Sequence, residues 1–178
     1  MREILFKAKR IDNGEWVEGC LVIDHSRSNL FEYRMQPVES GVLYAPPINP
    51  ETICQYTGLT DKNGNRIWEN DIANANSRDR IWENAIANTD SNVCVQIKFG
   101  KYSDGFTTWK YHQGFYMAFS DKGRDFYRNE LGYWHNKIEI VGNIFDNPEL
   151  VKEEKAWKRH VKAAERMIVV SAIAPAVW

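Results

Sequence analysis

Cysteine is scarce in this sequence, which contains only three in 178 residues: Cys20, Cys54 and Cys94. An odd number at wide spacing does not fit the dense, even set of a disulfide framework, and the C-x₂₋₄-C pairs of a zinc site are missing. The three side chains are therefore expected to be free thiols, buried or partly exposed, in a protein of a reducing compartment.

Strong charge and long apolar runs are also lacking. The formal net charge is -1 and the pI is near 6.4, so no global basic field draws the protein to nucleic acid or anionic membrane, which leaves room only for a local basic patch. The start, MREILFK, is charged early and shows no apolar core of a secretory signal. The longest apolar stretch, 167–178, is about half of the roughly 20 residues that span a bilayer. We expect a cytoplasmic protein with no membrane span.

Motifs of the common catalytic and cofactor sites are missing as well. The four histidines lack metal-binding spacings, the glycines form no phosphate-binding loop, and no serine lies in a G-x-S-x-G elbow. Glu69 and Asp71 would share one face of a strand and could form a carboxylate pair, but we expect them to be solvated charges at a sheet edge. The sequence therefore predicts no catalytic residue, no metal ligand, no cofactor and a protein that is not an enzyme.

The sequence is rich in aromatic residues and in β-strand periodicity. Its 7 Trp, 8 Tyr and 8 Phe supply ample material for a buried core. Apolar and polar residues alternate over 2–10, and the turn signal Asp12-Asn13-Gly14 makes the first 23 residues a predicted hairpin. A second hairpin is predicted over 52–72, turning at Asn63-Gly64, because Asn and Gly tolerate the positive φ of primed turns. Further strands are expected at 30–35, 93–99, 114–120 and 137–145, whereas prolines disfavour regular pairing across most of 36–51.

These patterns predict a mainly β fold, with antiparallel hairpins forming a barrel-like or sandwich domain over 1–147. Asn147-Pro148-Glu149 then signals a helix start, with Asn as the cap, Pro at the first helical position and an acid in the first turn. Residues 148–178 are expected to hold a C-terminal amphipathic helix and an apolar tail. The residues that share one face of this helix are Leu150, Trp157, Val161, Ala164 and Ile168.

The C-terminal segment combines a basic stretch with an apolar end. Residues 155–166 hold five Lys or Arg and one Glu, and mostly apolar residues follow. An exposed apolar tail would promote aggregation, so we expect it to dock on its own domain or across the interface of a homo-oligomer. A membrane surface and an acidic partner are the alternatives. The predicted interface residues are Trp157, Val161, Ile168 and Trp178.

A tandem repeat interrupts the predicted β domain. Residues 66–79 and 80–93 are identical at 9 of 14 aligned positions, which indicates a short tandem duplication rather than a solenoid. Either copy could supply the same strand, and the other must then form an excursion. The copies differ where Asp71 of the first is replaced by Ala85 in the second. Competition between them would favour register slippage or strand exchange between subunits.

Aromatic and basic residues gather between 98 and 116. On the face of a sheet, aromatic rings can stack on unpaired bases while lysines contact phosphates. A β-rich core also uses many aromatic residues, and this is the preferred interpretation of the run. The alternative is a single-stranded nucleic-acid-binding surface formed by Trp109, Tyr111, Phe115, Lys98 and Lys110.

Three segments together resemble the YopX family, whose members are encoded by phages and prophages of Gram-positive bacteria. They are the start MREILFKAKR, a central hairpin, and a closing IEIVGNIFDNPEL run. The chain departs from the family pattern at Asn70, where Gly is usual, in the repeat, and beyond about residue 151. The resembling positions are Gln55-Tyr56-Thr57-Gly58-Leu59, Asp61-Lys62-Asn63-Gly64, Ile67, Glu69, Asp71-Ile72, Val141-Gly142-Asn143-Ile144 and Asn147-Pro148-Glu149-Leu150.

The resemblance implies a mainly β fold, a tendency to oligomerise and a phage-related role, and it brings no catalytic residues. We therefore expect a non-enzymatic phage or prophage accessory protein that binds a host or phage macromolecule, for example to modulate a host process or defence system. A single-stranded nucleic-acid-binding module is the alternative function.

Overall fold

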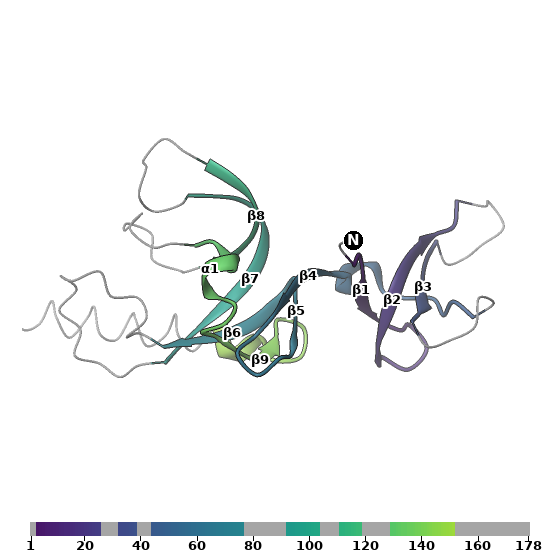
Figure 1. Ribbon diagram of the computed structural model, residues 1–178. Helices are drawn as coiled ribbons and strands as arrows, with labels where there is room; N and C mark the ends of the chain where they lie inside the picture. Colours follow the sequence, from purple (N-terminus) through teal and green to yellow (C-terminus); the bar gives the residue numbers. More distant parts are fainter. Residues whose placement is uncertain are drawn as a thin grey trace, which may run out of the picture.

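The computed structural model describes residues 3–25, 32–38, 44–76, 92–103, 111–118 and 129–151, which fold into two antiparallel β-sheets (Figure 1). The predicted mainly β class is confirmed. The described strands do not close into a barrel, and their two-sheet arrangement fits the sandwich form of the prediction.

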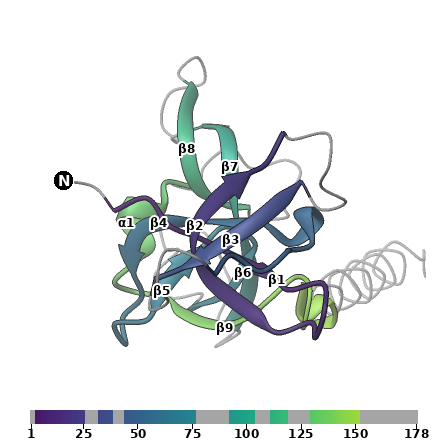
Figure 2. The ribbon, with the colours of Figure 1, turned by 90° about the vertical axis from the view of Figure 1, so that its right-hand side faces the viewer.

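The two sheets are built largely from neighbouring strands of the chain. The first has the order β3 (Tyr33–Pro37), β2 (Trp16–Ile23), β1 (Phe6–Lys9), β4 (Cys54–Thr60) and β5 (Arg66–Trp68). The second has the order β8 (Tyr111–Ala118), β7 (Asn92–Ser103), β6 (Asp71–Asn76) and β9 (Glu139–Asn143). In Figure 1, β1 to β3 lie at one end and β7 to β9 toward the other, with β4 between them. Figure 2, viewed from the side of β2 and β3, shows β7 and β8 rising above the other strands.

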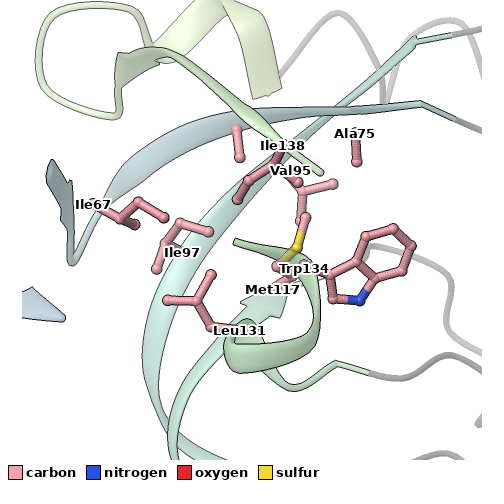
Figure 3. Close-up of a cluster of buried hydrophobic side chains, with 9 residues drawn as sticks. Ile67, Ala75, Val95, Ile97, Met117, Leu131, Trp134 and Ile138 are labelled. Carbon is pink, nitrogen blue, oxygen red and sulfur yellow. The ribbon is translucent and has the colours of Figure 1, made fainter. Parts of the chain in front are cut away.

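Three buried clusters hold these strands together. The largest packs β6, β7 and β8 against the short helix α1 (Leu131–Trp134), and Ile67 of β5 joins it (Figure 3). Its labelled members are Ile67, Ala75, Val95, Ile97, Met117, Leu131, Trp134 and Ile138. Two smaller clusters lie in the first sheet, one around Cys54, Tyr56 and Trp68 and the other around Met35 and Ile48. The sequence does not predict α1, because four residues are too few to show a helical period.

The edge of β3 is paired by a proline-rich segment for which regular pairing was not expected. The Met35 N–H donates to the Pro46 carbonyl at 3.1 Å, and the Ile48 N–H donates to the Tyr33 carbonyl at 3.1 Å. Ile48 also bridges to Arg10, at the end of β1. Proline lacks an N–H donor but keeps its carbonyl, so a short segment can still pair through its acceptors. This pairing covers backbone groups at an edge that would otherwise be open.

The central hairpin is confirmed, but its turn differs from the primed turn expected. Gly64 has a φ of 85°, whereas Asn63 does not have a positive φ. The Gly64 N–H donates to the Asp61 carbonyl at 3.0 Å, and the Asp61 N–H donates to the Asn65 carbonyl at 2.9 Å. This pattern fits a three-residue loop, in which only the last residue must adopt the left-handed conformation.

The Asp61 carboxylate organises this turn from inside the protein. Asp61 is only 4% exposed. Its oxygens accept from the backbone N–H groups of Asn63 at 2.9 Å, Asn65 at 2.8 Å and Ile140 at 3.1 Å, and from the Asn65 side chain at 3.2 Å. Burial acts to raise the pKa of Asp61, but these donors outweigh it, and the pKa lies below its ordinary value. The turn is thereby tied to β9 of the other sheet.

The first copy of the repeat supplies the strands. β5 and β6 span Arg66–Trp68 and Asp71–Asn76, and Asn70 between them has a φ of 67°. Asn is the best substitute for Gly at positive φ, so the departure from the family pattern preserves the local geometry. Residues 92 and 93 of the second copy belong to β7, and the rest of that copy lies outside the described residues.

The predicted helix start is present. Residues 148–151 are helical, and the Leu150 N–H donates to the Asn147 carbonyl at 3.2 Å. Pro148 occupies the first helical position, where its missing N–H costs nothing. The remainder of the predicted helix and the apolar tail lie outside the described residues.

The Asp61→Ala variant is expected to lose about 3 kcal/mol of unfolding free energy, because it removes the charged acceptor of three backbone N–H groups and one side-chain amide at once. Urea unfolding followed by tryptophan fluorescence measures the loss. Asn63→Ala is the matched control, since that side chain is exposed in the same turn, and its cost should stay under about 1 kcal/mol. Equal losses in the two variants would contradict the role of Asp61.

Candidate binding surface

A buried ion pair joins the two sheets. The Lys7 ammonium of β1 lies 2.7 Å from an Asp71 carboxylate oxygen at the start of β6, and the other oxygen accepts the Trp68 backbone N–H at 2.8 Å. The Asp71 side chain is 2% exposed and that of Lys7 13%. Asp71 is therefore not a solvated edge charge, and that expectation is wrong. Sequence alone missed this because the two partners are 64 residues apart.

Aromatic rings surround the cation of this pair. The Lys7 ammonium lies 5.2 Å from the Trp16 ring and 5.4 Å from the Trp68 ring. Burial raises the pKa of Asp71, while Lys7 and the Trp68 N–H oppose that shift. A buried charge is costly unless polar or aromatic groups stabilise it. The Trp68 N–H stabilises the Asp71 carboxylate, and the rings of Trp16 and Trp68 stabilise the Lys7 ammonium. The ion pair therefore serves as a structural link between β1 and β6.

Glu69 does not share the environment of Asp71. Burial raises the pKa of Glu69, and hydrogen bonds from the backbone of Gln55 and Phe99 act in the opposite direction. The two carboxylates therefore have different sets of donors, although they are only two residues apart in the chain. No interaction between them supports the carboxylate pair that the sequence allowed.

A second link joins the sheets at Asp146. Its carboxylate accepts from the Lys9 ammonium, from the Trp16 indole N–H at 2.7 Å and from the Asn143 amide at 2.7 Å. Phe145 packs on Trp16 with ring centroids 5.9 Å apart. Burial acts to raise the pKa of Asp146, but the three donors outweigh it and lower the pKa from 3.8 to about 2.

The three cysteines differ in exposure. All three lie in the described part of the chain and form no disulfide there: Cys54 is buried, Cys94 is partly buried and Cys20 is exposed, which goes beyond the partial exposure that was expected. Burial raises the pKa of the Cys54 thiol to about 12, so this group stays protonated and unreactive at neutral pH.

The β7–β8 hairpin extends beyond the core and offers an apolar face. Past the buried pair Ile97 and Met117, the next cross-strand pair on the same face is Phe99 and Phe115, with ring centroids 5.1 Å apart and planes at 65°. Phe99 is 48% exposed. The hairpin therefore carries the apolar surface of the core outward to solvent.

A cation lies over an aromatic ring further along this face. The Lys101 ammonium lies 4.2 Å from the centroid of the Tyr111 ring, and Tyr111 is 61% exposed. We call the surface of Phe99, Phe115, Lys101 and Tyr111 the apolar face. Tyr111 and Phe115, two residues of the predicted nucleic-acid surface, belong to it.

The opposite face of the same hairpin carries a row of stacked rings. Tyr102 and Tyr116 lie 5.6 Å apart with planes at 21°, and Tyr102 and His112 lie 5.6 Å apart at 30°. Lys98 is paired with Tyr116 across the strands and so shares this face. We call the surface of Lys98, Tyr116, Tyr102 and His112 the ring strip.

The ring strip was not predicted from the sequence, although the sequence contains a signal for it. Gly100 lies two residues before Tyr102, and Gly114 lies two residues before Tyr116, so period-two alternation places each glycine on the same face as the tyrosine of its strand. The structure separates Lys98 from Tyr111 and Phe115, because they lie on opposite faces. Trp109 and Lys110 lie outside the described residues, as do Trp157, Val161, Ile168 and Trp178.

Among the described residues, no group of three or more His, Cys, Asp or Glu side chains could hold a metal ion. No helix in this part of the chain has the length and apolarity needed to cross a membrane.

The strand order and the two-sheet arrangement define a mainly β protein whose hairpins pair antiparallel. The family model described as YopX protein matches residues 5–152, and the chain belongs to the YopX family. The resemblance noted in the sequence is therefore confirmed. A crystal structure of protein EF1440 from Enterococcus faecalis is similar at 22% identity, covering 85% of this chain and 99% of that one with a TM-score of 0.41. No curated protein matches the chain.

The Asp71→Ala variant is expected to lose about 3–5 kcal/mol of unfolding free energy, because it leaves the Lys7 ammonium partly buried without its counter-ion. Chemical denaturation at neutral pH measures the loss. The matched control is Glu139→Ala, which breaks a surface pair of the same 2.7 Å length with Lys62, whose two side chains are 45% and 43% exposed. This control should cost less than about 1 kcal/mol.

The repeat provides a further control for Asp71. Adding the missing carboxylate to the second copy, as in the double variant D71A/A85D, should not fully restore stability. The first copy directly follows Asn65, which Asp61 holds in the turn, so β5 stays in its register. Full recovery in the double variant would show that either copy can occupy the strand.

Asp146 makes the free energy of unfolding depend on pH in the acid range. Its folded-state pKa is depressed, so its contribution is fully present above the unfolded value of 3.8 and is lost as the pH falls toward about 2. The Asp146→Asn variant should be less stable than the wild type at neutral pH, and the difference should shrink between about pH 4 and 2. Denaturant melts at a series of pH values test this, and a difference that stays constant over this range would refute it.

Proposed function

We propose that this protein is a non-enzymatic accessory protein of a phage or prophage, which binds a host or phage macromolecule in the bacterial cytoplasm and acts as a homo-oligomer. Through this binding it modulates a host process or a defence system. The observation that carries the proposal is the exposed apolar face of the β7–β8 hairpin.

The chemistry of the apolar face is that of a protein-binding surface. Interface hot spots are enriched in aromatic side chains, which bury a large area with few rotatable bonds. Phe99 and Tyr111 have this character, and the Lys101 ammonium over the Tyr111 ring adds a charged group that a partner carboxylate could meet. A protein partner with an apolar patch and an acidic rim fits this surface.

Family membership supports the phage context, because the resemblance to YopX proteins implies it. The basic and apolar composition of 155–178 supports self-association, since an apolar end is best covered by a second subunit. Both parts of the proposal are tested with the same purified protein.

Affinity capture from lysate of the bacterial host tests the binding proposal. The wild-type bait is compared with a Phe99→Ala/Tyr111→Ala bait, and a Val22→Ala/Ile23→Ala bait serves as the control because those side chains are exposed on β2, in the other sheet. A specific partner should be recovered with the wild-type and control baits and lost at least about tenfold with the first variant. Equal recovery with all three baits would overturn the role of the apolar face.

The oligomer is tested by light scattering after size-exclusion chromatography. The full chain should elute as an oligomer, and a chain truncated after Val151 should have the mass of a monomer. A full chain that is monomeric at every concentration would contradict self-association.

A further inference from the structure

The ring strip and the apolar face lie on opposite faces of the β7–β8 hairpin. The apolar face carries the proposed function, and the ring strip has contacts of its own. Its two tyrosines face each other across a pair of glycines, because Gly100 and Gly114 are paired between them. A Cβ atom on Gly100 would lie 3.6 Å from the Tyr116 ring, and one on Gly114 would lie 3.8 Å from the Tyr102 ring. Each ring therefore extends over the glycine of the opposite strand.

This packing holds the rings in one orientation. Tyr102 lies between Tyr116 and His112, within 30° of parallel to each. Tyr102 and Tyr116 are partly exposed, and His112 is exposed. A row of nearly parallel rings on a sheet is preorganised for flat, aromatic groups, because little side-chain entropy remains to be lost on binding.

The strip carries one charge of each sign near Tyr116. Lys98 is exposed and lies directly across from Tyr116. Glu130 lies near the same rings, since it bridges to Tyr116 through the backbone and its carboxylate helps to raise the pKa of Tyr102, after the larger effect of partial burial. The strip thus offers one cation for a phosphate and one carboxylate that would weaken phosphate binding.

We propose that the ring strip binds single-stranded nucleic acid, with bases stacked on the outer rings of Tyr116 and His112, which Tyr102 holds in place, and a backbone phosphate at Lys98. In a duplex the faces of the bases are covered by their neighbours, so stacking on protein rings selects single strands. Stacking is tolerant of sequence, because every base has a π-face. Because Lys98 contacts about one phosphate, the binding affinity should depend only weakly on salt concentration.

The test uses the full chain and a fluorescein-labelled oligothymidylate of about ten nucleotides, within the range that single aromatic platforms cover. Fluorescence anisotropy at low salt should show saturable binding. The Tyr102→Ala and Tyr116→Ala variants should each weaken it by about tenfold or more, and Tyr→Phe at the same positions should leave it nearly unchanged. Glu130→Gln should tighten binding.

Controls separate the two faces and the fold. Tyr44→Ala removes a tyrosine that is 52% exposed on a different segment and should leave affinity unchanged. Phe99→Ala/Tyr111→Ala should also leave it unchanged, since those side chains lie on the apolar face. If the Tyr→Ala variants unfold, Lys98→Glu replaces them, because this exposed charge reversal should weaken binding without altering the melting temperature.

Three outcomes would overturn the inference: no binding of the wild type at low salt, equal affinity for duplex and single strand, or an equal loss in the Phe99→Ala/Tyr111→Ala variant. Loss of a captured protein partner with Tyr102→Ala and Tyr116→Ala, without oligonucleotide binding, would assign the strip to protein recognition instead. The proposed function is tested separately, because its Phe99→Ala/Tyr111→Ala variant changes the apolar face and not the ring strip.

Discussion

The ion pair between Lys7 and Asp71 is the constraint on which the arrangement of the two sheets depends. Taking both charges out of water is costly, and one contact at 2.7 Å does not offset that cost alone. The Trp68 N–H donates a hydrogen bond to the second carboxylate oxygen of Asp71, and the rings of Trp16 and Trp68 lie beside the Lys7 ammonium. Because these groups come from β1, β2, β5 and β6, they are satisfied together only when both sheets are in place. The interaction therefore supplies specificity more than net stability.

That requirement also explains which copy of the repeat forms the strands. The two copies share most of the residues that would pack in β5 and β6, so hydrophobic pattern alone does not choose between them. Ala85 of the second copy offers no carboxylate to Lys7, whereas Asp71 of the first does. The turn adds a second selection, since Asp61 binds Asn65 immediately before the first copy begins. Local turn chemistry and one long-range charge together fix a register that the duplication left ambiguous.

Features that depend on neighbouring residues were predictable from the sequence, and features that depend on distant partners were not. Alternation and the Asn63-Gly64 signal predicted the strands and the central hairpin, and Asn147-Pro148 predicted a helix start that residues 148–151 confirm. The burial of Asp71 was not predictable, because its partner is 64 residues away. The division of the 98–116 region into two faces required the register of β7 against β8, which places Lys98 with Tyr116 and apart from Phe115. Alternation shows which residues share a face of one strand, but cross-strand pairing decides which residues meet.

The length of the β7–β8 hairpin is the link between this architecture and binding. Its buried part ends near Ile97 and Met117, yet the two strands continue in register through six more pairs. A hairpin that leaves the core must be stabilised by its own cross-strand contacts, and the aromatic pairs on both faces provide them. The same contacts hold the rings in fixed orientations at the surface, so the side chains that stabilise the extension also preorganise it for a ligand. The ion pair lies outside both faces, so a change on either face leaves this link between the two sheets in place.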